Sequence, residues 1–338
     1  MTGKERIEAV LSRKEPDAVP SFEWFIDGGV GEALTGTSDP VEIIEGLDLD
    51  GINIRADYSS KPAGEDICTD EWGATRKLTG DCISAVIESP IKDIEDHAQY
   101  RFPDPQSPHR FATLEKALER FGDRRAIILN LRDGFSDMRD LLSYEEALVQ
   151  SMAEPELFAE LLDRVVEYNL ELARIARERY GLGIVATTDD VASARGLLLS
   201  PGHYFEVIGP AFQKVMQGYK DLGYLIIKHC DGEITPLIEF WIECGIDCLD
   251  PIDPDAGYRM ADMKARYGDR ICLKGNIDCK GTLCDGTPED QEAEVRQCIA
   301  DGGGGGGLIL SSSNTIHRGV KPENYRAMLG ALRKFGRY

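Results

Sequence analysis

The sequence lacks the long apolar runs that cross membranes. None of its segments approaches the roughly 18 consecutive apolar residues that a spanning helix needs. The first residues, 1–6, are polar and have no apolar signal region. We therefore expect a chain that neither spans a membrane nor carries a secretory signal.

Positive charge is scarce. The chain of 338 residues has 38 Lys and Arg against 60 Asp and Glu, a formal net charge of −22. This balance argues against nucleic acids and anionic membranes as partners, and it disfavours polyanionic substrates. The nine cysteines are odd in number and do not have disulfide-framework spacing. We interpret them as free thiols in a reducing compartment, which predicts a cytoplasmic protein.

Local motifs for metals and nucleotides are also missing. The sequence has no His-x-x-x-His or Cys-x-x-Cys, so no local motif indicates a metal. No Gly-x-Gly-x-x-Gly follows a predicted strand, which argues against dinucleotide binding. The glycine run 302–307 precedes a predicted strand and does not end in Gly-Lys-Ser/Thr, so we do not expect it to cradle a phosphate.

Eight short apolar segments have the composition of buried strands. They are residues 19–25, 51–55, 126–131, 184–190, 224–229, 246–251, 271–276 and 308–311. Helical patterns mostly separate them, as at 113–121, 143–180, 200–222 and 288–299. Alternation of this kind predicts parallel pairing, and eight units close into an α/β (β/α)₈ TIM barrel. We predict one barrel domain over residues 1–338; an open doubly wound sheet is the alternative.

One region interrupts the alternation after the second predicted strand. Residues 70–78 and 82–88 are strand-like, and Thr79-Gly80-Asp81 separates them. This pattern predicts a β-hairpin outside the main repeat.

The stretch 224–232 contains the highest density of side chains that could bind a metal or transfer a proton. It begins with four apolar residues, typical of a fully buried strand, and ends in His229-Cys230-Asp231-Gly232. In parallel α/β folds, ligands bind at the carboxyl ends of the strands. A buried core histidine beside an unrelated cysteine is the alternative for this stretch taken alone.

Polar or reactive residues follow most of the other predicted strands as well. These strand-end residues are Glu23, Asp57, Asn130, Asp133, Asp189, Asp190, His229, Cys230, Asp231, Asp250, Asn276, Asp278, Ser312, Asn314 and His317. We expect about half of them to be helix caps or turn residues. Two chemistries fit the others: a zinc site with an open position for substrate, or metal-free acid–base catalysis by Asp189 or Asp190 together with His229.

The assembled pattern resembles the uroporphyrinogen decarboxylase superfamily over essentially the whole chain. The matching stretches are Lys4-Glu5-Arg6-Ile7, Val19-Pro20, Asp70-Glu71-Trp72-Gly73, Phe102-Pro103-Asp104-Pro105, Asp189-Asp190, Ser200-Pro201, Tyr204, His229-Cys230-Asp231-Gly232, Lys274-Gly275-Asn276-Ile277-Asp278 and Pro322-Glu323-Asn324. The resemblance implies a (β/α)₈ fold and one of two chemistries: cofactor-free decarboxylation of a porphyrinogen, or methyl transfer involving a corrinoid protein.

The resemblance to the decarboxylases fails at one segment. Those enzymes have an arginine-rich segment after the first strand, which binds substrate carboxylates. Here residues 23–29 contain no arginine and two acids, Glu23 and Asp27. A substrate bearing eight carboxylates would be repelled there, so porphyrinogen decarboxylation is disfavoured.

The resemblance to the methyltransferases implies a metal. Members specific for coenzyme M hold zinc on His-x-Cys after the fifth strand and on a late cysteine. His229 matches, but Asp231 stands two residues later with Cys230 between them, and Ser311-Ser312-Ser313-Asn314 replaces the late cysteine. A harder site of His229, Asp231 and His317 is therefore predicted, with Cys230 as a further candidate ligand. The His-x-Asp-Gly form is more similar to bacterial members linked to O-demethylation.

We therefore predict transfer of a methyl group from a small methylated donor, such as an aryl methyl ether, to the cobalamin of a corrinoid partner protein. Catalytic roles are expected for His229, Asp189, Asp190 and Asp231. The predicted substrate-binding residues are Glu23, Asp57, Asn130, Asn276, Asn314, Phe22, Trp24 and Tyr58. The alternatives are a cofactor-free decarboxylase or lyase with a non-porphyrin substrate and a non-catalytic barrel that binds a small molecule. A homodimer is one of the states that the sequence allows.

Overall fold

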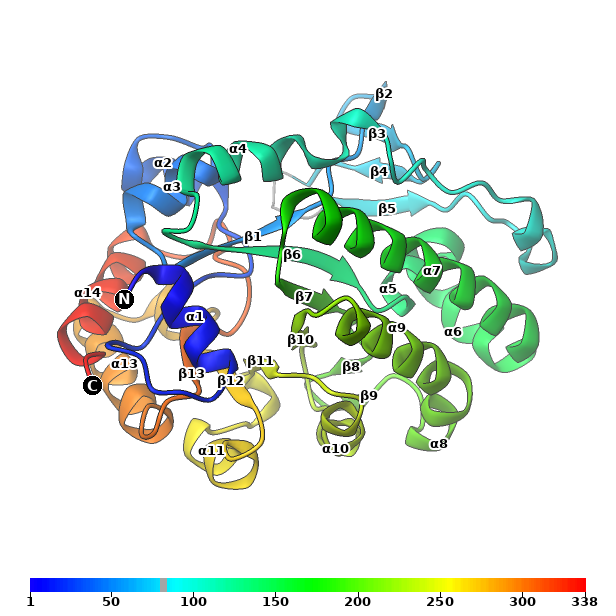
Figure 1. The fold of residues 1–338 in the computed structure, drawn as a ribbon. Coiled ribbons are helices and arrows are strands. Elements are labelled where there is room, and N and C mark those ends of the chain that lie inside the picture. Colours follow the sequence, from blue (N-terminus) through cyan, green and yellow to red (C-terminus); the bar gives the residue numbers. More distant parts are fainter. Residues whose placement is uncertain (80–83) are drawn as a thin grey trace.

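A curled sheet of seven parallel strands forms the centre of the fold (Figure 1). The computed structural model describes residues 1–79 and 84–338. In their order across the sheet, the strands are β1 (Gly51–Arg55), β6 (Ala126–Arg132), β7 (Ile184–Thr188), β10 (Leu225–His229), β11 (Cys248–Ile252), β12 (Cys272–Ile277) and β13 (Leu308–Ser312). Every neighbouring pair is parallel, so the chain must return through a crossover between strands. The predicted parallel α/β sheet is confirmed.

Helices make most of these crossovers. They are α1 (Gly3–Leu11), α2 (Gly28–Thr35), α3 (Pro40–Leu47), α4 (Ala112–Phe121), α5 (Phe135–Leu142), α6 (Tyr144–Ala153), α7 (Pro155–Tyr180), α8 (Pro201–His203), α9 (Gly209–Asp221), α10 (Thr235–Glu243), α11 (Met260–Tyr267), α12 (Thr282–Asp285), α13 (Pro288–Gly302) and α14 (Pro322–Phe335). Local sequence explains several starts: Asp39 caps α3 by accepting hydrogen bonds from two backbone N–H groups, and Pro155 opens α7.

The predicted first strand, residues 19–25, is the main departure from eight regular strands. Instead of a ladder, Ser21 makes an isolated parallel bridge to Leu310. The segment still contacts both edge regions of the sheet: Leu310 N donates to Pro20 O (3.0 Å) and Asp50 N donates to Ser21 O (2.9 Å). A regular strand is wrong here because Pro20 has no N–H and the Ser21 N–H is taken by the Asp50 carboxylate (2.9 Å).

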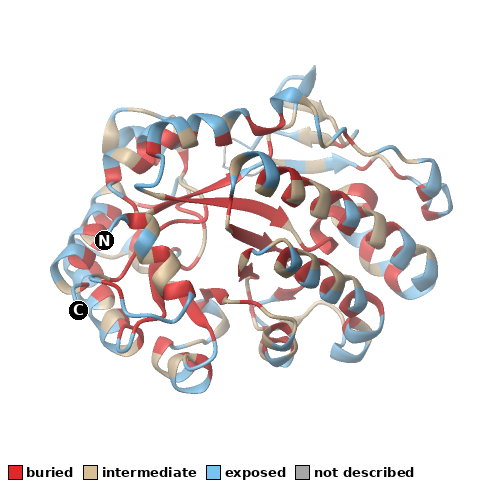
Figure 2. Cartoon of the chain, in the orientation of Figure 1, coloured by how far each residue is buried: buried red, intermediate tan, exposed pale blue. Residues whose placement is uncertain are grey.

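The expected hairpin is part of a larger antiparallel sheet. Its order is β2 (Ser60–Gly64), β3 (Ile67–Asp70), β4 (Thr75–Lys77) and β5 (Ala85–Glu88). β4 and β5 pair as two antiparallel strands, but most of the predicted turn, and Cys82 with it, lies outside the described residues. β2 and β3 are polar and half exposed or exposed, so no apolar alternation indicated them (Figure 2).

Two clusters of apolar side chains show which ends of the parallel strands are covered by helix α1. Along β7, Ile184 joins an inner cluster with Ile7 of α1, whereas Val185 joins the larger outer cluster. Lys4 of α1 also donates its backbone N–H to Arg124 O (3.4 Å), just before β6 begins. α1 therefore covers the amino ends of the strands and leaves the carboxyl ends available. None of the helices in the described ranges has the length and apolarity that crossing a membrane requires.

Candidate active site

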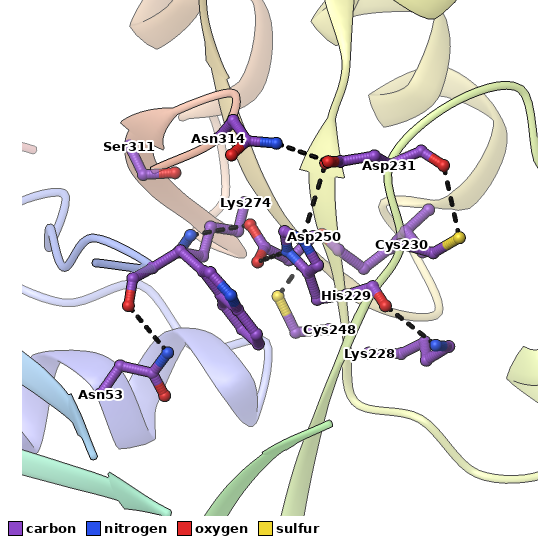
Figure 3. Close-up of polar contacts among 12 residues, drawn as sticks. Asn53, Lys228, His229, Cys230, Asp231, Cys248, Asp250, Lys274, Ser311 and Asn314 are labelled. Atoms are coloured by element: carbon purple, nitrogen blue, oxygen red, sulfur yellow. Dashed lines mark hydrogen bonds and ion pairs between the residues drawn. The ribbon is translucent and has the colours of Figure 1, made fainter. Parts of the chain in front are cut away.

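His229 is the last residue of β10 and lies at the carboxyl end of the sheet (Figure 3). It pairs in register with Thr188 on one side and Asp250 on the other. The residue is 4% exposed, and its imidazole stacks on Trp24 with ring centroids 4.0 Å apart and an interplanar angle of 15°. The stack on Trp24 and the burial of the residue restrict the orientation of the ring.

A buried carboxylate and a buried ammonium set the protonation of this imidazole. His229 Nδ1 lies 2.6 Å from Asp250 Oδ2, and Lys274 Nζ lies 2.7 Å from Asp250 Oδ1. Burial alone would raise the pKa of Asp250, but Lys274 and His229 hold it below its usual range. The ionised carboxylate only accepts hydrogen bonds, so Nδ1 carries a proton and Nε2 is directed toward Asp231.

Two further carboxylates complete a group with His229. Asp190, His229 and Asp231 each offer one ligand atom, and these three atoms lie within 4.8 Å of one another. Asp231 Oδ2 accepts a hydrogen bond from Asn314 Nδ2 (2.5 Å), whereas Asp231 Oδ1 is buried and accepts none from the described residues. Burial, opposed by His229 and reinforced by Asp190, raises the pKa of Asp231 to about 6.

This group fits a divalent cation. One imidazole nitrogen and two carboxylates are common ligands of zinc and of other divalent first-row metals, and three protein ligands leave a position for substrate. The Nδ1 contact of His229 to Asp250 is the carboxylate–histidine arrangement that orients metal-binding imidazoles. The buried Asp231 Oδ1 is an oxygen that a cation would satisfy.

Gly232 lets the chain turn directly after this group. Its φ is +93°, and a Cβ atom at this position would lie 2.6 Å from the backbone of Ser193. Ser193 belongs to the short hairpin of β8 (Ala192–Ser193) and β9 (Gly196–Leu197), and its carbonyl accepts from Glu233 N (2.8 Å). The close backbone contact holds this hairpin beside the group formed by Asp190, His229 and Asp231.

Two predicted metal ligands lie apart from this group. Cys230 is buried, its Sγ contacts Asp231 O (3.4 Å), and burial raises the pKa of the thiol far above its usual value. His317 Nε2 lies 3.7 Å from Cys284 Sγ. In the described part of the chain, Asp190 supplies the atom that we had expected from these residues.

Asp189 occupies a different position from its neighbour Asp190. Its carboxylate accepts the backbone N–H groups of Phe135 (2.6 Å) and Ser136 (2.7 Å), which begin α5. Burial, reinforced by the Asp133 carboxylate, raises the pKa of Asp189 to about 8. Asp189 thus positions a helix start, and its catalytic role stays a prediction.

Two of the predicted substrate-binding residues make intramolecular contacts. Asp57 accepts from Thr113 N (2.8 Å) and Thr113 Oγ1 (2.7 Å) near the start of α4. Asn276 Nδ2 donates to Ile252 O (2.6 Å). These bonds are the cap and turn contacts that we expected for about half of the strand-end residues.

The predicted aromatic residues divide in the same way. Trp24 packs on His229, as described above, and Phe22 is fully buried with Lys274 Nζ 4.7 Å from its ring centroid. Tyr58 lies farther along the strand ends, where its hydroxyl is 3.3 Å from that of Tyr168. Trp24 is therefore the predicted aromatic residue that contacts the group formed by Asp190, His229 and Asp231.

Glu23 is 3% exposed and lies near enough to Lys274 for the two charges to interact. Its Oε2 accepts hydrogen bonds from Ser312 N (3.2 Å) and Ser312 Oγ (2.7 Å). Burial, only partly opposed by Lys274, raises the pKa of Glu23 to about 7. The folded protein therefore binds a proton at Glu23 under conditions in which the unfolded chain has released it.

This proton makes stability depend on pH. Since the folded pKa is the higher one, its contribution is complete below the unfolded pKa and is lost as pH rises through about 7. Between pH about 5 and about 8, we expect the free energy of unfolding of the wild type to fall by about 3 kcal/mol more than that of Glu23→Gln. Urea unfolding at both pH values measures this. The exposed Glu119→Gln is the control, and an equal pH dependence in wild type and Glu23→Gln would contradict the expectation.

Sequence reasoning named Asp250 only as a strand-end residue and missed Lys274 as a site residue. Lys274 stands inside the apolar segment 271–276 and is 1% exposed. A lysine is almost never fully buried unless it is paired, so its place within a predicted buried strand was a usable signal for a carboxylate partner. The Asp250–Lys274 ion pair contacts His229 at Nδ1 and orients its imidazole.

Comparisons with known proteins show what the chain is similar to. A model of the family described as uroporphyrinogen decarboxylase (URO-D) matches residues 72–335. The chain is 28% identical over 192 residues to a uroporphyrinogen decarboxylase of Pseudoalteromonas translucida, covering 55% of this chain and 50% of that protein. It is 27% identical over 184 residues to a methylcobamide:CoM methyltransferase of Methanosarcina barkeri, covering 54% of this chain and 52% of that protein.

These two alignments span about half the length of the curated relatives. A solved structure, a methyltransferase from Methanosarcina mazei, superimposes with a TM-score of 0.79 at 20% identity and covers 99% of both chains. At this identity the likeness establishes the fold. Because the family model covers most of the chain, this protein belongs to the uroporphyrinogen decarboxylase (URO-D) family.

Proposed function

We propose that this protein transfers a methyl group from a small aryl methyl ether to the cobalt of a corrinoid protein. The observation that carries the proposal is the group formed by Asp190, His229 and Asp231, with a buried carboxylate oxygen that accepts no hydrogen bond from the described residues. Methyl transfer to an acceptor requires activation of a poor leaving oxygen, and a Lewis acid at the end of β10 is suited to that task.

The relatives support methyl transfer from a second direction. Besides the methylcobamide:CoM methyltransferase, the chain is 22% identical over 227 residues to a methylated-thiol–coenzyme M methyltransferase of Methanosarcina mazei. Other relatives are uroporphyrinogen decarboxylases. Residues 23–29 contain no arginine that could bind the many carboxylates of a porphyrinogen, so the methyltransferase chemistry is the better match.

In this proposal Asp190, His229 and Asp231 hold a divalent cation, with zinc as the expected metal. The cation would supply Lewis acidity to the leaving oxygen. Two carboxylates and a neutral imidazole balance its charge.

The surrounding residues hold these ligands in place. Asp250 keeps the proton on His229 Nδ1, Lys274 keeps Asp250 ionised, and Asn314 anchors Asp231. The stacked Trp24 keeps water from one face of the imidazole.

The chemical change is a substitution at carbon. The electron pair of Co(I) forms the Co–C bond, the C–O bond breaks with its pair going to oxygen, and the released phenolate takes up a proton from solvent. The acceptor must reach the methyl group, and α1 covers only the amino ends of the strands. We therefore expect the corrinoid protein to dock at the carboxyl ends.

A direct assay tests the proposal. Purified protein supplied with zinc, cob(I)alamin and para-methoxybenzoate is expected to form methylcobalamin, detected by absorbance, with an equal amount of para-hydroxybenzoate. Methanol and methylthiol serve as comparison donors. Release of CO₂ without methylcobalamin would favour a lyase, and binding without any reaction would favour a non-catalytic barrel; either result would overturn the proposal.

A further inference from the structure

Lys228 is a charged residue within the apolar strand β10, and it is 1% exposed. Along this strand Ile227 belongs to the inner apolar cluster and Ile226 to the outer one, so successive side chains alternate between the two sides of the sheet. Lys228 therefore points outward, toward the helices, whereas its neighbour His229 belongs to the candidate site. A lysine is almost never fully buried unless it is paired, so its partners are informative.

Three contacts occupy the ammonium of Lys228. It forms an ion pair with the carboxylate of Asp133, which directly follows β6 and is 4% exposed. It also donates hydrogen bonds to His229 O (2.9 Å; Figure 3) and to Asp189 O (3.4 Å). Burial alone would lower the pKa of Lys228, but the Asp133 carboxylate holds it above its usual value. The ammonium is therefore charged, and its three N–H groups have three acceptors.

Buried side chains surround this ion pair. Lys228 Nζ lies 4.8 Å from the ring centroid of Trp241 and 5.9 Å from that of Phe212, and both of these residues are buried. Thr187 Oγ1, which is also buried, donates to the Oδ1 atom of Asp133. An ammonium in such surroundings depends on fixed acceptors, because water is not there to replace them. The folded protein therefore keeps Lys228 in these contacts.

The two carbonyl groups that accept from Lys228 belong to the strand ends that carry the proposed metal ligands. The Asp189 carbonyl is part of the peptide bond that leads to Asp190, just beyond β7. The His229 carbonyl is at the end of β10, and Asp231 follows two residues later. β7 and β10 are neighbours in the sheet, and Asp231 N donates to Asp190 Oδ1 (3.3 Å). One ammonium thus connects the two backbone segments from which the ligands project.

We propose that Lys228, paired with Asp133, is a positioning residue for the divalent cation. Its ammonium ties the ends of β7 and β10 together and so fixes the spacing of Asp190, His229 and Asp231. This inference rests on the proposed function, because it requires these three residues to hold a cation, but it does not require methyl transfer. The three ligand atoms lie within 4.8 Å of one another, and a shift of either strand end would change that spacing. Groups that orient metal ligands contribute about tenfold to a hundredfold to affinity or activity.

The test uses a variant that removes the contact without leaving a buried charge. In Lys228→Met/Asp133→Asn both charges are lost together, and the side-chain oxygen of asparagine can still accept from Thr187 Oγ1. Zinc affinity is measured by titration against a chelating indicator, and the visible absorption spectrum of the Co²⁺-loaded protein reports the ligand geometry. We expect zinc affinity to fall about tenfold to a hundredfold and the Co²⁺ bands to shift, while urea unfolding stays cooperative.

The matched control makes the same two changes at the other end of β10. Lys220 of α9 forms an ion pair with Asp247 Oδ2 (2.5 Å), which also accepts from Ile226 N (2.7 Å) near the start of the strand. Lys220→Met/Asp247→Asn should bind zinc with the wild-type affinity and give the wild-type Co²⁺ spectrum. Lys228→Met alone should unfold at a lower urea concentration than the double variant, because it leaves Asp133 buried without its partner.

The outcomes separate the two proposals. Wild-type zinc affinity and an unchanged Co²⁺ spectrum in Lys228→Met/Asp133→Asn, or an equal loss in the control, would overturn the positioning role even if the wild type forms methylcobalamin. Weaker zinc binding with a changed spectrum, in a folded double variant only, would support the role even if no methylcobalamin forms and methyl transfer is wrong. A wild type that binds neither zinc nor Co²⁺ would overturn the role of Lys228 together with the cation. If the double variant fails to fold, Lys228→Leu/Asp133→Asn provides the same comparison.

Discussion

Substitution of His229 by alanine is expected to remove the bound divalent cation and to lower methyl transfer by more than about a hundredfold. Loss of a group that merely orients a metal ligand already costs about 10–100-fold in affinity or activity, and loss of the ligand itself should cost more. The remaining ligands, Asp190 and Asp231, would then face each other as two carboxylates without the imidazole between them.

Metal content by mass spectrometry, together with the methylcobalamin assay, measures this effect. The matched control is His203→Ala on α8, whose imidazole lies 3.4 Å from Ser151 Oγ and away from the carboxylate group. We expect the control to retain about one equivalent of zinc. If wild type and His229→Ala contained the same amount of metal, the assignment of His229 as a ligand would be wrong.

Replacing Lys274 by methionine is expected to destabilise the fold by about 3–5 kcal/mol. Lys274 and Asp250 are each 1% exposed and form an ion pair of 2.7 Å. Methionine has a similar volume but leaves the Asp250 carboxylate buried with only His229 beside it. An uncompensated buried charge is costly because water can no longer solvate it.

Urea unfolding of this variant beside Lys334→Met provides the comparison. Lys334 forms an ion pair of 2.6 Å with Glu292, but the two side chains are 57% and 48% exposed. A surface pair of this kind contributes at most about 1 kcal/mol. Similar destabilisation in both variants would show that burial of the Asp250 pair adds nothing to its energetic importance.

Much of the parallel sheet could be predicted because its strands are buried on both faces. Such strands appear as continuous apolar runs, and seven of the eight predicted segments are regular strands. The segment 19–25 has the same composition, but its hydrogen bonds go to Asp50 and to isolated bridges. β2 and β3 escaped prediction because exposed strands need no apolar pattern.

The location of the candidate site could be predicted from the sequence, but the full set of residues that form it could not. His229, Asp231 and Asp190 stood out as reactive residues after buried strands, and the structure brings them together. Cys230 was a plausible ligand from its position in the motif, but it follows the end of β10 and its thiol is not among the grouped ligand atoms. Its thiol is buried and contacts the Asp231 carbonyl instead.

The sequence by itself determined the alternation of strands and helices, the end of the sheet that carries the chemistry, and the absence of an arginine-rich segment at residues 23–29. Only the tertiary structure decided which polar groups share a cavity and which are used as caps. Asp189 and Asp190 are adjacent in the chain, yet one accepts the N–H groups that begin α5 and the other faces His229. The physical reason is that hydrogen bonding and ion pairing depend on distances of a few ångströms between residues far apart in sequence, and packing alone sets those distances.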